Sequence, residues 1–338
     1  MDIQPESSDF TKTLNLPWDD EAYLSVEEFN RRVEQGAITI DGVIAAVPPN
    51  VHYDIARQWA ERNVPVWVEK PLILTDQLDQ MESLIAKYPG KIFPVDFFMD
   101  CAPVNFLLAN RKILQSIGKI RRFDGCLVEN WPLESGREWL VDPKVSGGGL
   151  GMDILVHPFA LADKLLTACG ITDVILIEDV VCGRYNENLP GTEETYMYVE
   201  GRAGNASIYI EGGKGVDEHY YGVSLTGEHG RIDICTGMEG CDPYISIQNQ
   251  ENKIYSFPNQ GIGYRGTFFD FLLLLYGSSE SCYTSLAERL KAGVNSVAYM
   301  KEAYAKKKEC LIYTVGQRPP VPEKPLGQVL PFMIKKKS

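Results

Sequence analysis

Short apolar runs alternate with amphipathic segments in the first third of the chain. The runs cover residues 41–47, 66–68 and 92–95, and the amphipathic segments cover about 52–62 and 76–87. Short continuous apolar runs are typical of strands that are buried on both faces of a parallel sheet. Pro48-Pro49-Asn50 ends the first run, and Thr75 is the expected N-cap of the second helix. This order of elements predicts right-handed βαβ units in a doubly wound sheet.

The pattern changes beyond about residue 120. A helix from about 104 to 116, closed by Gly118, leads into short runs that are rich in Val, Ile and Tyr and separated by Gly or Asn. Such runs predict a large, mostly antiparallel sheet. Its strands are expected at 120–128, 174–182, 195–200, 206–211, 221–225, 231–234, 244–247 and 254–257. A helix from about 152 to 166 interrupts the sheet, and a long helix from Ser285 to about Lys308 follows it.

These patterns predict a fold in two parts. Residues 1–98 are expected to form an incomplete Rossmann-type parallel sheet, and residues 99–325 an α+β domain with a large, mostly antiparallel open sheet. Residues 326–338 are expected to be a tail. Another helix is predicted from Val26 to about Gln35, because Ser25 and Glu28 match a capping box.

Composition narrows the possible partners. The net charge is −13 over 338 residues, so nucleic acids and anionic membranes would repel the chain. The longest apolar stretch, Phe268–Tyr276, contains Asp270 and is well short of the roughly 20 residues that span a bilayer. Residues 1–10 do not resemble a secretory signal. The eight cysteines are scattered without a Cys-x-x-Cys pair, which favours reduced thiols in a cytoplasmic protein and predicts no metal site.

Two motifs carry the strongest functional signal. Glu69-Lys70-Pro71 follows the second apolar run, and the glycine cluster 147–151 (GGGLG) leads into a helix with the spacing Asp153-x-x-x-His157. Together with the long antiparallel sheet, these motifs resemble the glucose–fructose oxidoreductase / inositol dehydrogenase / MocA (Gfo/Idh/MocA) family over about residues 20–318.

The resemblance implies an N-terminal Rossmann domain that binds NAD or NADP, and a small sugar or polyol as substrate. It also implies a C-terminal domain whose open sheet makes homo-oligomer contacts. Lys70, Asp153 and His157 fall on the family's catalytic positions.

The residues themselves fit that chemistry. Removing hydride from a secondary alcohol requires a base for the hydroxyl proton, and His157 suits this role. Asp153, four residues earlier on the expected helix, would share its face and orient the imidazole. Lys70 at the carboxyl end of a parallel strand could hold the substrate hydroxyl and the nicotinamide ribose. The glycine cluster would let the backbone approach a ligand closely.

The other candidate positions line the expected cleft. Cofactor contacts are expected from Val47, Pro48, Asn50, His52, Glu69 and Lys70, and substrate contacts from Trp131, Arg137, Trp139, Tyr264 and Arg265. Each position also has a simpler interpretation. His157 alone could be a packed or capping histidine, Glu69 and Lys70 an exposed ion pair, and His52 a polar residue at a helix start.

The phosphate-binding loop is the missing part of this pattern. A dinucleotide site requires G-x-G-x-x-G between a strand and a helix, and residues 1–24 contain no glycine. Gly261-Ile-Gly263-Tyr-Arg-Gly266 matches literally but lies in the antiparallel part, and 147–151 lacks the third glycine. The absent first strand would also leave a sheet edge unpaired.

Three explanations are compatible with this pattern. The chain could be an incomplete version of a longer protein, could bind only part of the cofactor through the strand ends, or could have lost dehydrogenation. The sequence thus predicts an NAD(P)-dependent oxidoreductase acting on CH–OH groups of a sugar, polyol or related compound. The alternative is a ligand-binding or assembly protein that is built on the same fold.

Overall fold

The computed structural model describes residues 25–133, 136–185, 193–237, 242–260, 263–278 and 283–319. The predictions for residues 1–24 and for the tail 326–338, and those that involve Cys241, Gly261 and Cys282, lie outside these residues. The chain divides into two compact units, residues 1–43 and 44–338. The predicted domain boundary at residue 98 therefore stays a prediction.

The first unit contains the helix α2 (Val26–Glu34). Its predicted N-cap is confirmed, because the Ser25 hydroxyl accepts a hydrogen bond from the Glu28 backbone N–H. The Glu28 carboxylate bonds to Arg31 and Arg32. The pKa of Glu28 is lowered to about 2 by these hydrogen bonds.

The small sheet matches the first predicted pattern. It has the strand order β1-β2-β3, made of β1 (Val43–Ala45), β2 (Val66–Val68) and β3 (Ile92–Pro94), with β2 and β3 parallel. Within the described residues β1 is an edge strand, and 54% of the Ile44 side chain is exposed. All residues of β2 and β3 are buried, as expected for strands covered on both faces.

Helices connect these strands. They are the short η3 (Pro49–Val51), α3 (His52–Glu61), η4 (Thr75–Gln77) and α4 (Leu78–Lys87). Thr75 was expected to cap the second helix, but that prediction is wrong. Thr75 opens η4 instead, and Gln77 precedes α4 without a side-chain cap bond.

The segment after β3 leads towards the large sheet. It consists of η5 (Phe97–Asp100), α5 (Ala102–Ala109) and α6 (Arg111–Ser116). A single helix was expected over 104–116, but the backbone leaves the helical region at Asn110 (φ −115°, ψ 55°). Gly118 ends the segment with φ +75°, a conformation that glycine adopts without strain.

In the part of the chain that the structure describes, the large sheet has nine strands in the order β11-β10-β9-β8-β4-β7-β6-β5-β12. In chain order these are β4 (Ile120–Glu129), β5 (Leu176–Tyr185), β6 (Tyr196–Ala203), β7 (Ala206–Lys214), β8 (Tyr220–Gly227), β9 (Arg231–Cys235), β10 (Tyr244–Gln248), β11 (Lys253–Ser256) and β12 (Leu311–Tyr313). Among these described strands only the pairs β4–β7 and β5–β12 are parallel. The predicted fold class, with its large and mostly antiparallel sheet, is confirmed. β12 was not predicted.

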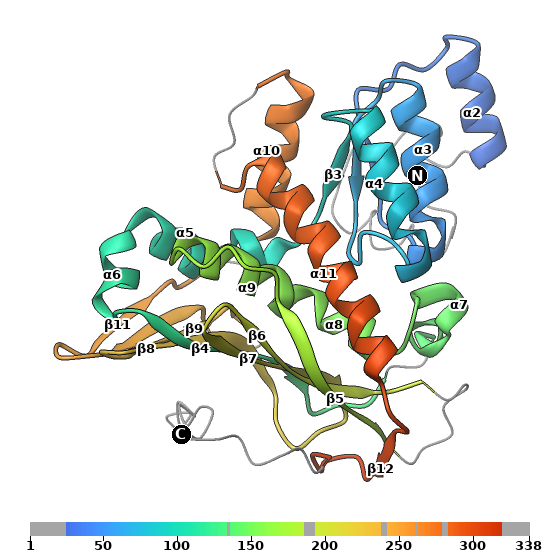
Figure 1. Cartoon of the computed structure of the whole chain (residues 1–338). Coiled ribbons are helices and arrows are strands. Elements are labelled where there is room, and N and C mark those ends of the chain that lie inside the picture. Colours follow the sequence, from blue (N-terminus) through green and yellow to red (C-terminus); the bar gives the residue numbers. More distant parts are fainter. Residues whose placement is uncertain are drawn as a thin grey trace. The chain divides into compact units, whose positions relative to one another are not determined.

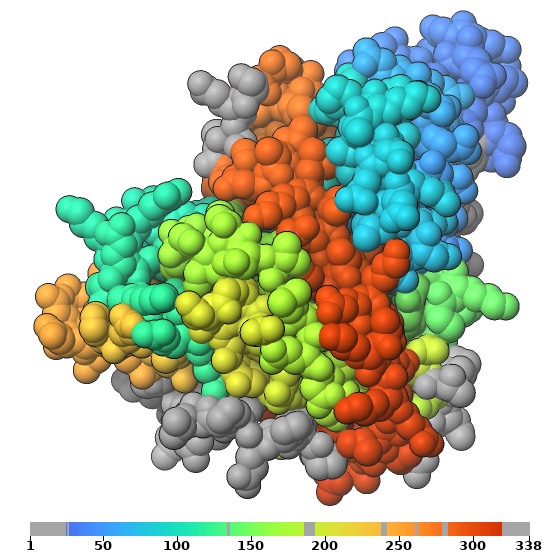
Figure 2. All heavy atoms as spheres, in the orientation of Figure 1, coloured from blue at the N-terminus to red at the C-terminus, as the bar shows by residue number. Residues whose placement is uncertain are grey.

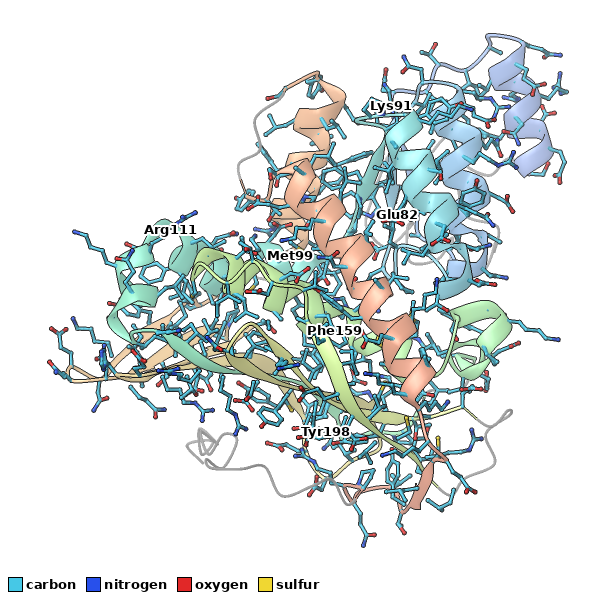
Figure 3. The ribbon with its side chains drawn as sticks, in the orientation of Figure 1. Glu82, Lys91, Met99, Arg111, Phe159 and Tyr198 are labelled. Carbon is cyan, nitrogen blue, oxygen red and sulfur yellow. The ribbon has the colours of Figure 1, made fainter. Side chains whose placement is uncertain are left out.

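The helices of this part are η6 (Glu138–Val141), α7 (Pro143–Ser146), α8 (Leu150–Ile154), α9 (Val156–Ala168), α10 (Tyr264–Leu275) and α11 (Leu286–Lys306). α8, α9 and α11 lie over one face of the large sheet, whereas α10 packs on the small sheet through Phe271, which contacts Trp67 and Phe93 (Figure 1). Ser285 and Glu288 form a capping box at the start of α11, whose outer face is uncovered along this side of the unit (Figure 2). Met99 packs with Ala160 and Ala292 between η5, α9 and α11 (Figure 3).

The predicted helix over 152–166 is interrupted. α8 ends at Ile154, α9 begins at Val156, and the segments Pro143–Ile154 and Val156–Ala168 meet at an angle of 53°. Among the described residues no single helix has the length and apolarity to cross a bilayer, although these two bent segments together pass that test. Because of this bend, Asp153 and His157 do not lie on one face of a continuous helix.

Candidate active site

Lys70 and Asp153 form an ion pair across 83 residues of sequence. Lys70 follows β2, and its Nζ donates to Asp153 Oδ1 at 2.6 Å and to the Asp153 carbonyl oxygen at 2.9 Å. Both side chains are 21% exposed. Burial alone would raise the pKa of Asp153, but the Lys70 ammonium outweighs it and holds that pKa below its usual value. The site therefore holds an ionised carboxylate next to a fixed ammonium.

His157 pairs with a different carboxylate from the one expected. Its Nδ1 lies 3.0 Å from Asp96 Oδ1, and both residues are buried. The prediction that Asp153 orients His157 is wrong, because the chain bends between α8 and α9. Asp96 also accepts a hydrogen bond from the Phe98 N–H at 3.1 Å, so it holds the imidazole from a fixed position.

Asp96 was missed by the sequence analysis. It follows β3 directly, separated from it only by Val95. An acidic residue at the carboxyl end of a buried parallel strand is a signal that could have found it, because ligands bind at that end of open sheets.

Aromatic rings enclose His157. The ring centroids of Phe97 and Phe98 lie 5.2 and 4.7 Å from the imidazole centroid. Tyr264, a predicted substrate residue, stacks on Phe97 at 4.2 Å and is 50% exposed. Burial raises the pKa of Tyr264 to about 12. The structure thus brings Tyr264 near the histidine through Phe97. Its neighbour Arg265 is exposed in the first turn of α10.

Trp131 is connected to the same region by a series of ring contacts. It follows β4, and its ring lies 4.4 Å from that of His219. His219 contacts Tyr221 at 5.0 Å, and Tyr221 contacts Phe98 at 6.0 Å. This series joins Trp131 to the rings around the imidazole.

Arg137 and Trp139 lie on a different segment. Arg137 precedes η6 and Trp139 lies within it, and η6 packs against α8, the helix of Asp153. Their contact with a substrate stays a prediction.

Three polar residues on the large sheet were not predicted. Lys214 of β7 and Tyr221 of β8 both donate to the carboxylate of Glu129 on β4. The Lys214 ammonium lies 5.9 Å from the Trp131 ring centroid and contributes to the low pKa of Asp153. Lys214, Tyr221 and Glu129 thus form a polar cluster on the large sheet, and the charge of Lys214 acts on Asp153.

His52 holds two strand-end loops together. Its Nε2 lies 2.8 Å from the Val47 carbonyl oxygen, and its Nδ1 lies 3.0 Å from the Pro71 carbonyl oxygen. Because the ring is fully buried, burial lowers its pKa. His52 therefore holds the loops after β1 and β2 together, and its expected contact with the cofactor stays a prediction.

The other predicted cofactor residues surround these loops. Val47 and Pro48 are half-buried in the loop after β1, and Asn50 lies in η3. Glu69 follows β2 and accepts a hydrogen bond from the Trp67 indole at 3.2 Å. Their contact with a cofactor stays a prediction.

The glycine cluster packs against the protein's own side chains. The N–H groups of Gly149 and Gly151 donate to Glu194 Oε1 at 3.1 and 3.2 Å, and a Cβ at Gly148 would collide with the Tyr304 hydroxyl. The expectation of a ligand at these glycines is therefore corrected. Glu194 is fully buried, and its Oε2 accepts from Lys307 at 2.7 Å.

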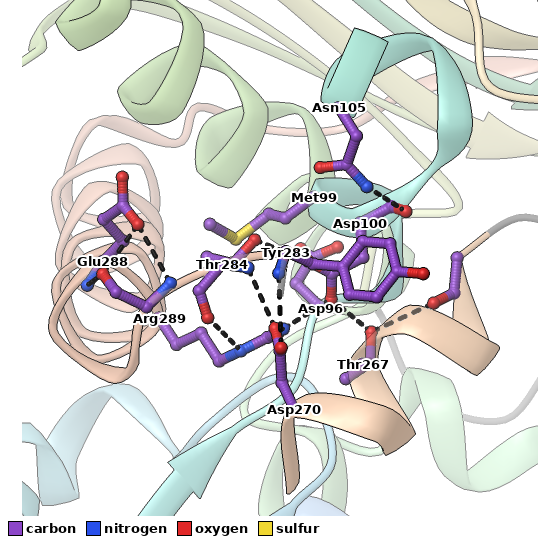
Figure 4. Close-up of polar contacts among 12 residues, drawn as sticks. Asp96, Met99, Asp100, Asn105, Thr267, Asp270, Tyr283, Thr284, Glu288 and Arg289 are labelled. Atoms are coloured by element: carbon purple, nitrogen blue, oxygen red, sulfur yellow. Dashed lines mark hydrogen bonds and ion pairs between the residues drawn. The ribbon is translucent and has the colours of Figure 1, made fainter. Parts of the chain in front are cut away.

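A buried polar network fixes the turn that carries Asp96. Arg289 Nη2 donates to Asp100 and to Asp270 at 2.7 Å each, and the Arg289 side chain is 1% exposed (Figure 4). The hydroxyls of Thr267 and Thr284 also donate to Asp100. Asp100 ends η5, whose N-cap is Asp96. The turn is thus held at one end by α10 and α11 and at the other end by His157.

Lys70 and Asp96 share one small cavity. Its space for water is about 10 Å³, and Arg289 and Val156 also line it, which is room for a single water molecule. Arg289 Nη1 is buried without a hydrogen-bond partner among the described residues. The lysine at the end of β2 and the histidine-bound carboxylate after β3 thus line the same cavity.

Comparison with known proteins agrees with this architecture. Residues 2–95 match the Gfo/Idh/MocA family model, described as an oxidoreductase family with an NAD-binding Rossmann fold. An uncharacterized oxidoreductase of Bacillus subtilis (strain 168), YfiI, is 27% identical over 146 residues. That alignment covers 40% of this chain and 37% of the relative, so it spans little more than a third of that protein.

Solved structures share the fold over most of the chain. The aldose-aldose oxidoreductase from Caulobacter crescentus, complexed with glycerol, has a TM-score of 0.68 at 15% identity, covering 90% of this chain and 87% of its own. A levoglucosan dehydrogenase in complex with NADH and levoglucosan has a TM-score of 0.65 at 17% identity, with the same coverage. The chain is thus similar to the Gfo/Idh/MocA oxidoreductase family over residues 2–95, and it shares the fold of these solved structures over most of its length.

Proposed function

We propose that the chain is an NAD(P)-dependent oxidoreductase that acts on a hydroxyl-bearing carbon of a sugar, polyol or related compound. One observation carries the proposal. Lys70, whose ammonium is fixed by Asp153, follows β2. His157 lies on α9, and its imidazole is bound by Asp96, which follows the neighbouring strand β3. A cation and a base at one place are what alcohol oxidation requires.

His157 is the proton acceptor in this proposal. With Nδ1 bonded to Asp96, Nε2 is the ring atom that takes the hydroxyl proton. Asp96 Oδ1, 3.0 Å from Nδ1, holds the ring in this orientation and stabilises the imidazolium that forms. Lys70, held by Asp153, donates to the substrate oxygen and stabilises the negative charge that develops there.

The described residues fit the nicotinamide end of a dinucleotide. The loops after β1 and β2 carry Val47, Glu69 and Lys70, and His52 fixes the two loops relative to each other. Bound nicotinamide would supply the hydride acceptor. For the pyrophosphate, the described residues offer no glycine loop between a parallel strand and a helix. The glycines at 263 and 266 lie at the start of α10, after the antiparallel β11.

Names of the structural relatives support the substrate class. Both solved relatives above are named for reactions of sugars or an anhydrosugar. The exposed Tyr264 offers an aromatic face beside Phe97, which contacts His157, and such faces stack on sugar rings.

The test combines cofactor binding with turnover. The full chain is titrated with NADH and NADPH while nucleotide fluorescence is followed, and oxidation of a panel of sugars and polyols is assayed. We expect binding of at least one nucleotide, and turnover that falls at least 100-fold in His157→Asn. The matched control is His229→Asn, because His229 is exposed in the β8–β9 turn.

Two outcomes would contradict the proposal. One is a folded chain that binds neither nucleotide at millimolar concentration, which would favour a ligand-binding or assembly role. The other is turnover in His157→Asn within tenfold of the unmodified chain, which would remove the histidine from the proton transfer.

A further inference from the structure

Two cysteines lie side by side on neighbouring parallel strands, away from the proposed catalytic groups. Leu311 of β12 pairs with Gly183 of β5. Cys182 directly precedes Gly183 within β5, and Cys310 directly precedes Leu311, the first residue of β12. Neighbouring strands are about 4.8 Å apart, and disulfides span Cα separations of about 4.4–6.8 Å. Residues in register on parallel strands also point to the same face, so the two thiols are placed for bonding.

The two thiols differ in environment. Cys182 is 1% exposed, whereas Cys310 is half-buried. A hydrogen bond between their side chains is the main cause that lowers the pKa of Cys310 and raises the pKa of Cys182. The nearby Lys307 ammonium favours the Cys310 thiolate as well. Cys310 is therefore the nucleophile of the pair, since the thiolate is the reactive form.

We propose that Cys182 and Cys310 are a redox site that forms a reversible disulfide on exposure to a peroxide. The Cys310 thiolate attacks one peroxide oxygen and breaks the O–O bond, which gives a sulfenic acid and hydroxide. The Cys182 thiol then attacks the Cys310 sulfur, the S–O bond breaks, and water leaves as the disulfide forms. The two sulfurs lose two electrons in total, and the peroxide gains them.

The disulfide would stiffen a segment that borders the candidate active site. Lys307, three residues before Cys310, pairs with Glu193 and Glu194. Glu194 in turn accepts hydrogen bonds from the backbone N–H groups of Gly149 and Gly151. Gly151 lies two residues before Asp153. Tethering Cys310 to β5 restrains the backbone of 307–313, which predicts slower hydrogen exchange there. The redox site itself does not depend on the proposed dehydrogenase activity.

The test uses the full chain, reduced with dithiothreitol, desalted and treated with hydrogen peroxide. Remaining thiols are blocked with N-ethylmaleimide and the peptides are mapped by mass spectrometry. We expect a linked peptide pair that joins Cys182 to Cys310, lighter by two hydrogen atoms than the separate peptides, which disappears on re-reduction. The amides of 307–313 should exchange more slowly in the oxidised chain.

Variants separate this pair from general thiol oxidation. Cys310→Ser should abolish the linked peptide, and Cys182→Ser should leave a Cys310 sulfenic acid that dimedone traps. Cys169→Ser is the matched control. Cys169 is also half-buried, but burial raises its pKa to about 11, so its replacement should change nothing.

Two results in the unmodified chain would overturn the proposal, even if a variant fails to fold. One is recovery of both cysteines as maleimide adducts after peroxide treatment. The other is oxidation that links a different cysteine pair or two separate chains.

Discussion

Asp96 and His157 are joined by a 3.0 Å contact between Oδ1 and Nδ1, although 61 residues separate them. The carboxylate that would orient the proposed base therefore comes from the end of β3, not from the base's own helical segment. Asp153, four residues before His157, is instead paired with Lys70. The two acidic residues thus have separate tasks.

Replacing Asp96 tests this division of tasks. In Asp96→Asn the amide no longer stabilises the imidazolium, and we expect kcat to fall roughly 100- to 10,000-fold with a smaller change in KM. Asp163→Asn is the control. Asp163 is a buried carboxylate as well, but it lies on α9 and bonds to Asn295 and Tyr299 instead of His157. An equal loss of kcat in both variants would reduce Asp96 to a structural role.

The Lys70–Asp153 pair predicts a specific dependence of stability on pH. The pKa of Asp153 is lowered in the folded chain, so its stabilising effect is complete above its ordinary pKa of about 3.9. It is lost as pH falls through the lower folded value. The difference in Tm between the unmodified chain and Asp153→Asn should be constant from pH 7 to pH 5 and shrink below pH 4. A difference that already disappears at pH 5 would contradict the pairing.

The buried His52 should make stability depend on pH in a higher pH range than Asp153 does. Burial lowers its pKa in the folded chain, so unfolding favours proton uptake as pH falls below the ordinary value of about 6.5. The unmodified chain should therefore lose stability between pH 6.5 and pH 5, and His52→Asn should lose less over that interval. Thermal melts at each pH measure this, with His229→Asn as the exposed control. Parallel curves for all three proteins would refute it.

Replacing Arg289 should lower the free energy of unfolding substantially. Removing the guanidinium leaves the buried carboxylates of Asp100 and Asp270 without their cation, which typically costs about 3–5 kcal/mol. We expect urea unfolding of Arg289→Met to show a loss of that size. The triple variant Arg289→Met/Asp100→Asn/Asp270→Asn should recover part of it, because the unpaired charges are then gone. No recovery would mean that packing of the arginine, rather than charge, dominates.

Much of the fold could be predicted from local pattern. β2 and the large-sheet strands follow from buried apolar runs and from alternation, because these signals are contained within a few residues. β12 was missed because it is three residues long and two of them, Leu311 and Ile312, are substantially exposed. No local signal marks such a strand, which is placed by pairing with β5.

The candidate site could be predicted in composition but not in its pairings. Lys70, Asp153 and His157 were selected because their motifs resemble a known family. The partner of the histidine was assigned wrongly, since a helical spacing of four residues implies a shared face only where the helix continues. The 53° bend and the long-range Asp96 contact depend on tertiary packing, which a single sequence does not reveal.

The turn from Asp96 to Asp100 has a consequence for biosynthesis. Its far end is anchored by Arg289, which lies on the last long helix of the described chain. In a growing polypeptide, the ion pair between Arg289 and Asp100 thus cannot form until α11 has emerged from the ribosome. The proposed activity should accordingly arise late during translation, and nascent chains that are stalled before residue 289 should be inactive even when the small sheet and strands β4 to β11 have formed.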